Sequence, residues 1–148
     1  GVRIDLIIRG ICTLRPGIAG VSDNIAVRSI VGRFLEHHRL FYFRSGGNEK
    51  IFLSSADWMP RNLNERVELM IPIEDKRHKA RIKGILDLYL VDTLKAHLMR
   101  ADGSYYKVYN IEGPLSAQEE LMEAANTQDS REQMTVIERF KPMFKMKE

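Results

Sequence analysis

The chain contains very little cysteine and no long apolar run. A single cysteine, Cys12, cannot form an internal disulfide, which excludes the disulfide scaffolds of small secreted proteins. No stretch approaches the roughly 18 consecutive apolar residues of a membrane-spanning helix, and no signal peptide precedes the first predicted strand. We therefore expect a reducing, cytoplasmic setting, either free in the cytoplasm or peripherally associated with a membrane.

Several motifs that bind metals, nucleotides or nucleic acids are also missing. The four histidines and one cysteine follow no spacing typical of zinc sites. The glycine-rich segment at 44–47 lacks the Gly-Lys-Ser/Thr ending of a Walker phosphate-binding loop. The charged run at 75–79 is expected to be solvated, and no concentrated basic face or aromatic platform motif indicates a nucleic-acid partner. We expect no protein-held metal and no nucleic-acid binding.

The 148 residues, 44% hydrophobic and 29% charged, have the size and composition of one globular domain that can bury a core. The net charge is only +3, but the basic residue types are unevenly distributed. Residues 1–75 contain nine arginines and one lysine, whereas residues 76–148 contain five arginines and eight lysines. Arginine binds phosphates and carboxylates bidentately, so the first half favours an oxyanion site. The equal alternative is that these arginines only keep the surface soluble.

Apolar patterns along the chain predict a mixed β-sheet flanked by helices, of the α/β or α+β class. Strands are expected at residues 2–8, 40–43, 50–53, 66–73, 95–100 and 105–109, with hairpin turns at 44–48 and around Asp102-Gly103. Helices are expected at 25–35, 75–90 and 116–126, and an irregular loop at 54–64. Residues 1–126 then form one domain, followed by a charged tail at 127–148. Because a core strand begins almost at once and no methionine precedes it, we expect a fragment of a longer protein.

His37 and His38 directly follow the helix predicted at 25–35. The N-cap side chains expected for this helix are those of Ser22, Asp23 and Asn24. A helix C-terminus favours the imidazolium form, and an imidazole beside Arg39 could donate a proton to a phosphate oxygen or stabilise it. The alternative is that both histidines are surface or helix-capping residues.

The segment 53–63 is rich in polar functional groups. After a predicted strand it offers two hydroxyls, a carboxylate, an indole, a guanidinium and a carboxamide, from Ser54, Ser55, Asp57, Trp58, Arg61 and Asn62. Hydroxyl, amide and guanidinium donors are the groups that hold phosphoryl oxygens. The alternative is a turn whose tryptophan packs on the core.

Several segments, taken in order, resemble the bacterial polyphosphate kinases of the first type. They are 8–12 with 14–17, 22–25, 28–37, and 54–63 followed by Arg66-Val67-Glu68. The Ser-Ser-Ala-Asp-Trp-Met-Pro-Arg-Asn-Leu segment at 54–63 is the most recognisable, and 28–37 resembles the family's next helix. The resemblance covers most of residues 1–73 and continues more loosely to about residue 109.

The resemblance implies the phospholipase D-like carboxy-terminal domain of a multidomain enzyme that reversibly transfers the terminal phosphate of ATP to inorganic polyphosphate. It implies a phosphohistidine in a preceding domain, His37 as the second catalytic histidine, and Arg9 and Arg66 as ATP or phosphate contacts. Assisting roles are expected for Arg39, Arg61, Ser54, Ser55 and Asn62. Mg²⁺ is expected with ATP, with its ligands outside these residues, and the enzyme is expected to be a homo-oligomer.

Two alternatives from other functional classes stay open at this point. One is a phosphodiesterase or nuclease of the phospholipase D superfamily, whose His-x-Lys motif requires a lysine where Arg39 stands. The other is a non-catalytic polyanion-binding module, which the arginine bias alone supports. His38 leaves a further question open, namely which of two neighbouring imidazoles acts.

Overall fold

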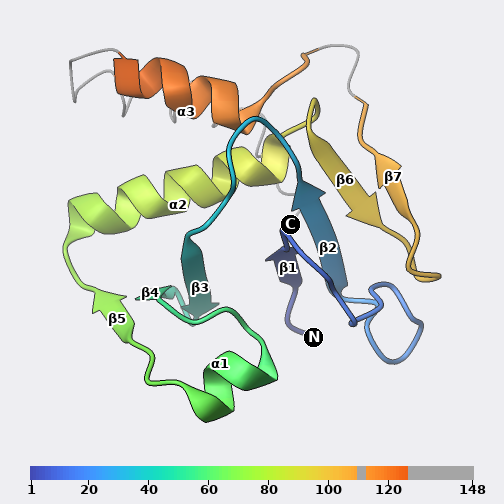
Figure 1. Cartoon of the computed structure of the whole chain (residues 1–148), viewed down its shortest axis with the longest axis horizontal. Helices are drawn as coiled ribbons and strands as arrows, with labels where there is room; N and C mark the ends of the chain where they lie inside the picture. Colours follow the sequence, from blue (N-terminus) through green and yellow to red (C-terminus); the bar gives the residue numbers. More distant parts are fainter. Residues whose placement is uncertain (110–112, 127–148) are drawn as a thin grey trace. The chain divides into compact units, whose positions relative to one another are not determined.

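The computed structural model describes residues 1–109 and 113–126, and the chain divides into two compact units (Figure 1). Unit 1 comprises Gly1–Leu35 and Leu86–Glu148, and unit 2 comprises Glu36–Ile85. The helix α2, Lys76–Val91, contributes residues to both units. Among the described residues no helix is long and apolar enough to span a membrane.

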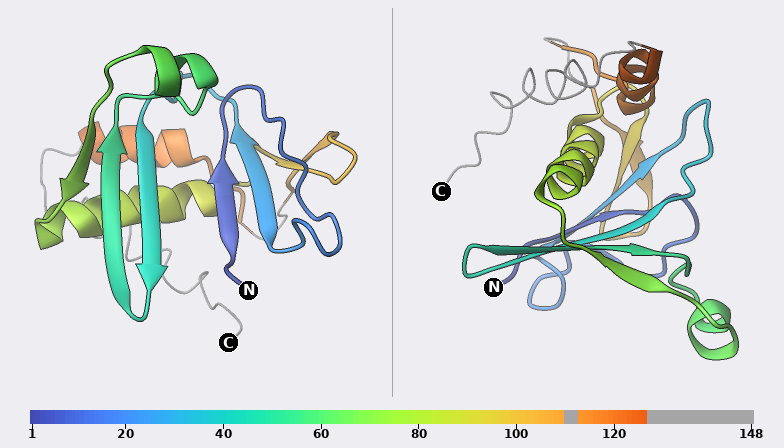
Figure 2. Two further views of the ribbon diagram at one scale, coloured as in Figure 1. Left: turned by 90° about the horizontal axis from the view of Figure 1, so that it is seen from below. Right: turned by 90° about the vertical axis from the view of Figure 1, so that its left-hand side faces the viewer.

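Unit 1 contains a four-stranded sheet in the order β1-β2-β6-β7. Its strands are β1 (Ile4–Ile7), β2 (Ile25–Ile30), β6 (Ala96–Met99) and β7 (Tyr105–Lys107). The strands β1 and β2 are parallel, whereas β2–β6 and β6–β7 are antiparallel (Figures 1 and 2). Val27, Ile30 and Ala96 are almost fully buried, so β2 and the start of β6 lie at the centre of the core. This arrangement confirms the predicted mixed sheet in a fold that also contains helices.

A buried carboxylate joins three elements of unit 1 immediately after α2. Asp92 is fully buried, and its Oδ1 accepts the backbone N–H groups of Lys95 at 2.7 Å and Ala96 at 2.9 Å. Its Oδ2 accepts the N–H of Ala117 at 2.8 Å, at the first residue of helix α3 (Ala117–Asn126). The Arg28 guanidinium donates to the Asp92 carbonyl at 3.2 Å. Burial lowers the pKa of Arg28, and the attraction of Asp92 opposes that shift.

A carboxamide on α3 holds the loop that follows β2. Gln118 is buried, its Nε2 donates to the Phe34 carbonyl at 2.8 Å, and its Oε1 accepts the Phe34 N–H at 3.0 Å. Both backbone groups of Phe34 are thereby satisfied. A side chain at Gly32 would collide with the Gln118 amide, so this position requires glycine unless the amide moves.

Unit 2 contains an antiparallel sheet in the order β3-β4-β5 and one short helix. The elements are β3 (Arg39–Ser45), β4 (Asn48–Ser54), α1 (Pro60–Glu65) and β5 (Met70–Ile73). The strands β3 and β4 lie side by side as a long hairpin (Figure 2). Gly46 and Gly47 join them with φ values of 55° and 80°, which a two-residue turn of this kind requires and glycine adopts without strain.

The helix predicted at 25–35 is wrong, because residues 25–30 form β2 and residues 31–38 form a loop. Ile25, Val27 and Ile30 are β-branched, and such side chains lose rotamer freedom in a helix but pack well on a pleated sheet. Pairing with strands on both sides satisfies the backbone of this segment. Tertiary pairing therefore outweighs a helical apolar stripe.

The side chains expected to cap that helix stabilise the preceding loop instead. Ser22 Oγ donates to the Arg15 carbonyl at 2.6 Å, and Asp23 Oδ2 accepts the Gly20 N–H at 3.0 Å. Asn24 donates its amide to the Val2 carbonyl. Short polar side chains satisfy turn backbones as readily as helix ends, which explains the wrong assignment.

Most of the other predicted helices and strands are present in the structure, some with different bounds. Both hairpins and the two later helices are confirmed, and Ser116 Oγ accepts the Glu119 N–H at 3.4 Å as a capping box requires. The segment expected to be an irregular loop contains α1, and the strand expected at 66–73 is limited to β5. The tail predicted at 127–148 lies outside the described residues.

We predict that Asp92→Ala lowers the free energy of unfolding by at least about 3 kcal/mol, because three buried N–H groups lose their acceptor. Urea denaturation monitored by circular dichroism measures the change. Asp102→Ala, at an exposed turn, is the matched control and is expected to have a much smaller effect. Equal losses in the two variants would contradict the central role of Asp92.

Candidate functional site

The sheet of unit 2 has two chemically different faces. Register pairs Arg39 with Ser54 and Phe41 with Phe52, so these side chains project from one face. Tyr42 projects from the opposite face, where the ammonium of Lys83 lies 5.5 Å from the centre of its ring. The first face thus combines aromatic side chains with the polar groups of the segment after β4.

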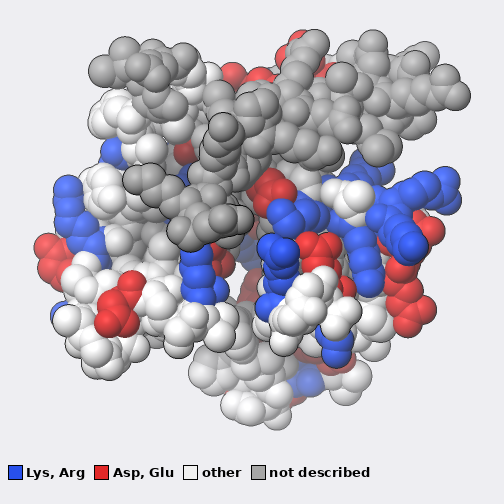
Figure 3. Space-filling view, turned by 180° about the vertical axis from the view of Figure 1, so that it is seen from behind, with Lys and Arg blue, Asp and Glu red and all other residues white. Residues whose placement is uncertain are grey.

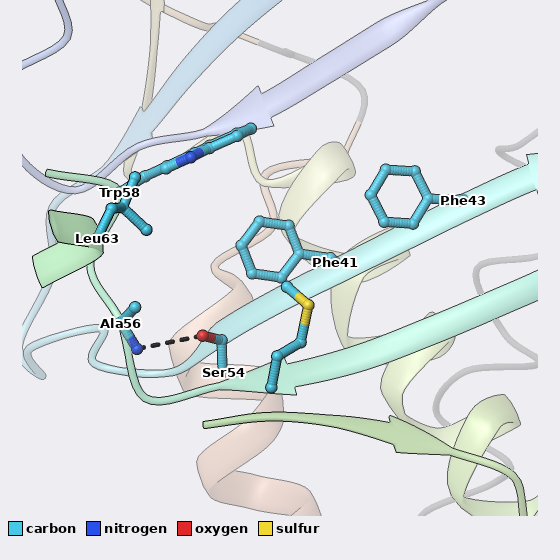
Figure 4. Close-up of a pocket in the computed structure, with 7 residues that line it drawn as sticks. Phe41, Phe43, Ser54, Ala56, Trp58 and Leu63 are labelled. Carbon is cyan, nitrogen blue, oxygen red and sulfur yellow. Dashed lines mark hydrogen bonds between the residues drawn. The ribbon is translucent and has the colours of Figure 1, made fainter. Parts of the chain in front are cut away.

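A shallow pocket of about 180 Å³ opens on this first face (Figure 4). Its lining comes from β3, β4, β5, α1 and the segment between β4 and α1, namely from Phe41, Phe43, Ser54, Ala56, Trp58, Leu63 and Met70. Trp58 packs edge-on against Phe41, with ring centres 5.7 Å apart, while 73% of the Trp58 side chain and backbone stays exposed. The walls are mainly apolar, and the Ser54 hydroxyl accepts the Ala56 N–H at 3.1 Å within them.

A guanidinium links an imidazole and a carboxylate beside this pocket. Nε and Nη2 of Arg39 both lie 2.9 Å from Asp57 Oδ1, and Nη1 lies 3.2 Å from His37 Nδ1. The Arg39 side chain is 19% exposed and that of Asp57 34% exposed, which strengthens their attraction over that of a fully solvated pair. Strand pairing places Arg39 opposite Ser54, three residues before Asp57, and so brings the charged groups together.

This contact determines which nitrogen of His37 carries the proton. A guanidinium contains only donors, so Nδ1 of His37 accepts in the contact with Arg39. The neutral ring then carries its proton on Nε2, which can donate to an oxygen of a ligand. Asp57 holds Arg39 by charge-assisted hydrogen bonds, and Arg39 in turn orients His37.

His38 has a different environment from His37. Its Nδ1 lies 3.6 Å from Glu36 Oε2, whereas His37 contacts Arg39. Both histidines lie in the loop before β3, and the helix C-terminus expected there does not exist. The argument for imidazolium from a helix dipole is therefore wrong for both residues.

Two other predicted site residues support the local fold. The Ser55 hydroxyl donates to Glu68 and accepts the Leu69 N–H at 3.0 Å, which ties the end of β4 to the segment before β5. Asn62 is 4% exposed, and within the described part of the chain its Oδ1 is buried without a hydrogen-bond partner. Such an acceptor is costly unless a further donor reaches it.

The predicted arginines divide between the two units. Arg9 lies in unit 1, two residues after β1, whereas Arg61 lies in α1 and Arg66 directly follows it in unit 2. All three are exposed. Within unit 2 the structure therefore brings together His37 and Arg39, and leaves Arg61 and Arg66 available to solvent.

Sequence reasoning missed the structural role of Asp57 and the aromatic wall formed by Phe41 and Phe43. The alternation of these phenylalanines in a predicted strand was the available signal for the wall. The pairing of Arg39 with Asp57 depends on strand register across 18 positions, so no local pattern reveals it.

The side chains gathered at this site include donors of the kind that suits an anion. Among residues 1–109 and 113–126 no three His, Cys, Asp or Glu side chains gather as metal ligands. The described donor set therefore does not fit a protein-ligated Mg²⁺. An Nε2–H of His37, the nearby serine hydroxyls and exposed guanidiniums fit phosphoryl oxygens instead.

Comparison with known proteins identifies close relatives. The sequence model of the family described as "Polyphosphate kinase C-terminal domain 2" matches residues 1–118. Polyphosphate kinases of Pseudomonas aeruginosa and Bacillus anthracis are 59% identical over 108 residues and 57% identical over 110 residues. These alignments cover 73% and 74% of this chain but only 16% of each relative.

The fold is also similar to a solved structure. The crystal structure of polyphosphate kinase from Porphyromonas gingivalis superposes with a TM-score of 0.81 at 37% sequence identity. The match covers 90% of this chain and 20% of that one. The described chain therefore resembles a small part of much longer proteins.

We predict opposite tautomers for two histidines, measurable by long-range ¹H–¹⁵N NMR at about pH 8, where ordinary histidines are neutral. His37 is expected to carry its proton on Nε2, and His97, whose Nδ1 faces the Lys95 carbonyl at 3.1 Å, on Nδ1. Arg39→Ala should remove the preference of His37 and leave His97 unchanged. An Nδ1–H tautomer of His37 in the unsubstituted protein would contradict the geometry.

Proposed function

Because this chain belongs to the polyphosphate kinase C-terminal domain family, we propose that it forms part of the active site of an ATP-dependent polyphosphate kinase. The enzyme would reversibly transfer the terminal phosphate of ATP to inorganic polyphosphate. The match of the family over residues 1–118 is the observation that carries this proposal. The chain spans about 16% of the length of its relatives, so other domains would supply the rest of the site.

The proposed reaction proceeds in two steps through a histidine of a preceding domain. An imidazole nitrogen attacks the γ-phosphorus of ATP, the N–P bond forms, and the bond to the β–γ bridging oxygen breaks as ADP leaves. A terminal oxygen of polyphosphate then attacks the phosphohistidine, which lengthens the polymer by one phosphate and restores the imidazole. Both steps are reversible.

His37 would act on the leaving group rather than as the nucleophile. Its Nε2–H can donate a hydrogen bond to the departing ADP oxygen or to the transferring phosphate, because Arg39 occupies Nδ1. Asp57 and Arg39 are positioning residues in this proposal, since they act through the imidazole. The contact of Arg39 with the exposed His37 ring is the observation that supports a phosphate-contacting role.

The exposed guanidiniums would neutralise charge that spreads over phosphate oxygens during transfer. We assign this role to Arg9 and Arg66, with Arg61 and the hydroxyl of Ser54 as assisting groups. Mg²⁺ would accompany ATP through its phosphate oxygens. An enzyme of this kind is expected to act as a homo-oligomer together with its preceding domains.

We predict that His37→Ala in the full-length enzyme lowers the rate of ATP-dependent polyphosphate synthesis by at least about 100-fold, because the phosphate oxygens that gain charge during transfer lose a hydrogen-bond donor. Synthesis is measured from the ATP consumed and polymer formed, with circular dichroism to verify folding. His38→Ala is the matched control, since that imidazole faces Glu36, and it should retain most activity. Near-normal synthesis by the His37 variant would reject the assigned role.

The 148-residue chain on its own is expected to synthesise no polyphosphate, because in this proposal the nucleophilic histidine belongs to a preceding domain. The measurement compares the chain with the full-length enzyme at equal concentration and with the same ATP and primer. Synthesis by the chain alone would show that the two-domain site is wrong.

A further inference from the structure

The N-terminal half of α2 has an unusual concentration of positive charge. Its basic side chains are Lys76, Arg77, Lys79, Arg81 and Lys83, and we call this set the α2 basic strip. No aspartate or glutamate occurs between residues 76 and 85. The charged run that seemed only solvated in the sequence is thus the beginning of a longer positive surface.

Helix electrostatics disfavours this arrangement. Cations destabilise the N-terminal end of a helix, where the macrodipole is positive. The first turn of α2 contains no acidic residue, and the capping carboxylate of Asp75 offsets these cations only in part. Arg77 with Arg81, and Lys79 with Lys83, are also like-charge pairs at i,i+4 spacing, which oppose helix formation. Departures of this kind from local rules are expected where function requires them.

The backbone N–H groups at the start of α2 are not available to bind an anion. The Asp75 carboxylate accepts the N–H groups of Arg77 at 2.9 Å and His78 at 3.0 Å, so it occupies that end of the helix. Asp75 also lies 3.9 Å from the Arg77 guanidinium, which is a weak, solvated pair. Anion binding would therefore depend on the basic side chains themselves.

Two members of the strip extend it onto the β3–β4 hairpin. Lys79 Nζ donates to the Glu49 carbonyl at 3.4 Å, and Lys83 lies over the Tyr42 ring. Lys76, Arg77 and Arg81 are exposed. Figure 3 shows lysine and arginine side chains gathered over this half of α2, on the right of that view. Because Tyr42 and Phe41 project from opposite faces of the sheet, the strip and the pocket lie on opposite sides of it.

We propose that the α2 basic strip binds a segment of the polyphosphate chain on the face of the unit 2 sheet opposite the pocket and Arg39. This inference rests on the proposed function for its ligand. Eight residues of helix span about 12 Å, with Lys76, Lys79 and Lys83 on one side and Arg77 and Arg81 on another, so an extended polymer that follows the helix can reach cations on either side. The ring that contacts the strip, that of Tyr42, is half-buried beneath Lys83 and offers a base little surface to stack on, which favours polyphosphate over single-stranded nucleic acid.

The test uses the full-length enzyme and two triple variants with equal loss of charge. In the strip variant, Lys76→Gln, Arg77→Gln and Arg81→Gln remove three exposed cations while glutamine keeps the helix propensity. In the control variant, Arg3→Gln, Arg100→Gln and Lys107→Gln remove three exposed cations of unit 1. Affinities for long-chain sodium polyphosphate, tripolyphosphate and single-stranded DNA are measured against salt concentration, together with KM and kcat.

We expect the strip variant to bind long-chain polyphosphate about ten-fold more weakly at low salt, with a salt dependence shallower by about two to three ion equivalents. Tripolyphosphate affinity, kcat and the KM for ATP should stay unchanged, and the control variant should bind the long polymer as the unsubstituted enzyme does. Equal loss in both variants, no loss in the strip variant, or a larger loss of DNA binding would overturn the proposal. An unsubstituted enzyme that makes no polyphosphate from ATP would overturn the proposed function and this inference with it.

Discussion

The buried carboxylate of Asp92 is the interaction on which the rest of unit 1 depends. Three N–H groups from the start of β6 and the start of α3 converge on its two oxygens. A carboxylate without water around it is stable only when such donors surround it, so the chain must bring these segments together. The same contact fixes where α3 begins, and one residue further on Gln118 holds the backbone of Phe34. One buried charge thus organises elements that are distant in sequence.

Unit 2 relies on strand pairing to assemble its polar site. The β3–β4 register brings Arg39 opposite Ser54, and the turn after β4 returns Asp57 to the guanidinium. Aromatic side chains from the same face of β3 form the wall of the neighbouring pocket. The tautomer of His37 follows from this strand pairing, because Arg39 donates to Nδ1 and the proton of the neutral ring is then on Nε2. The register of the β3–β4 pair therefore determines how the His37 side chain is held.

Local signals in the sequence predicted the elements whose geometry is itself local. Gly46-Gly47 and Asp102-Gly103 identify their hairpins, and the helical stripes identify α2 and α3. The helix prediction for residues 25–30 was wrong because the apolar residues of this segment fit both the helical and the strand periodicity. Only pairing with the neighbouring strands decides between the two. For the site, resemblance indicated His37, but its contact with Arg39, and the hold of Asp57 on Arg39, follow from three-dimensional pairing. The catalytic roles stay predictions.

Trp58, at the rim of the pocket, is the single tryptophan of the chain. Every photon of indole emission from these 148 residues therefore originates beside Phe41. A ligand that enters the pocket changes the polarity and the quenching around this one ring, while events elsewhere leave it largely unaffected. The molecule thus contains its own optical probe, and occupancy of the pocket can be followed in real time without any attached label.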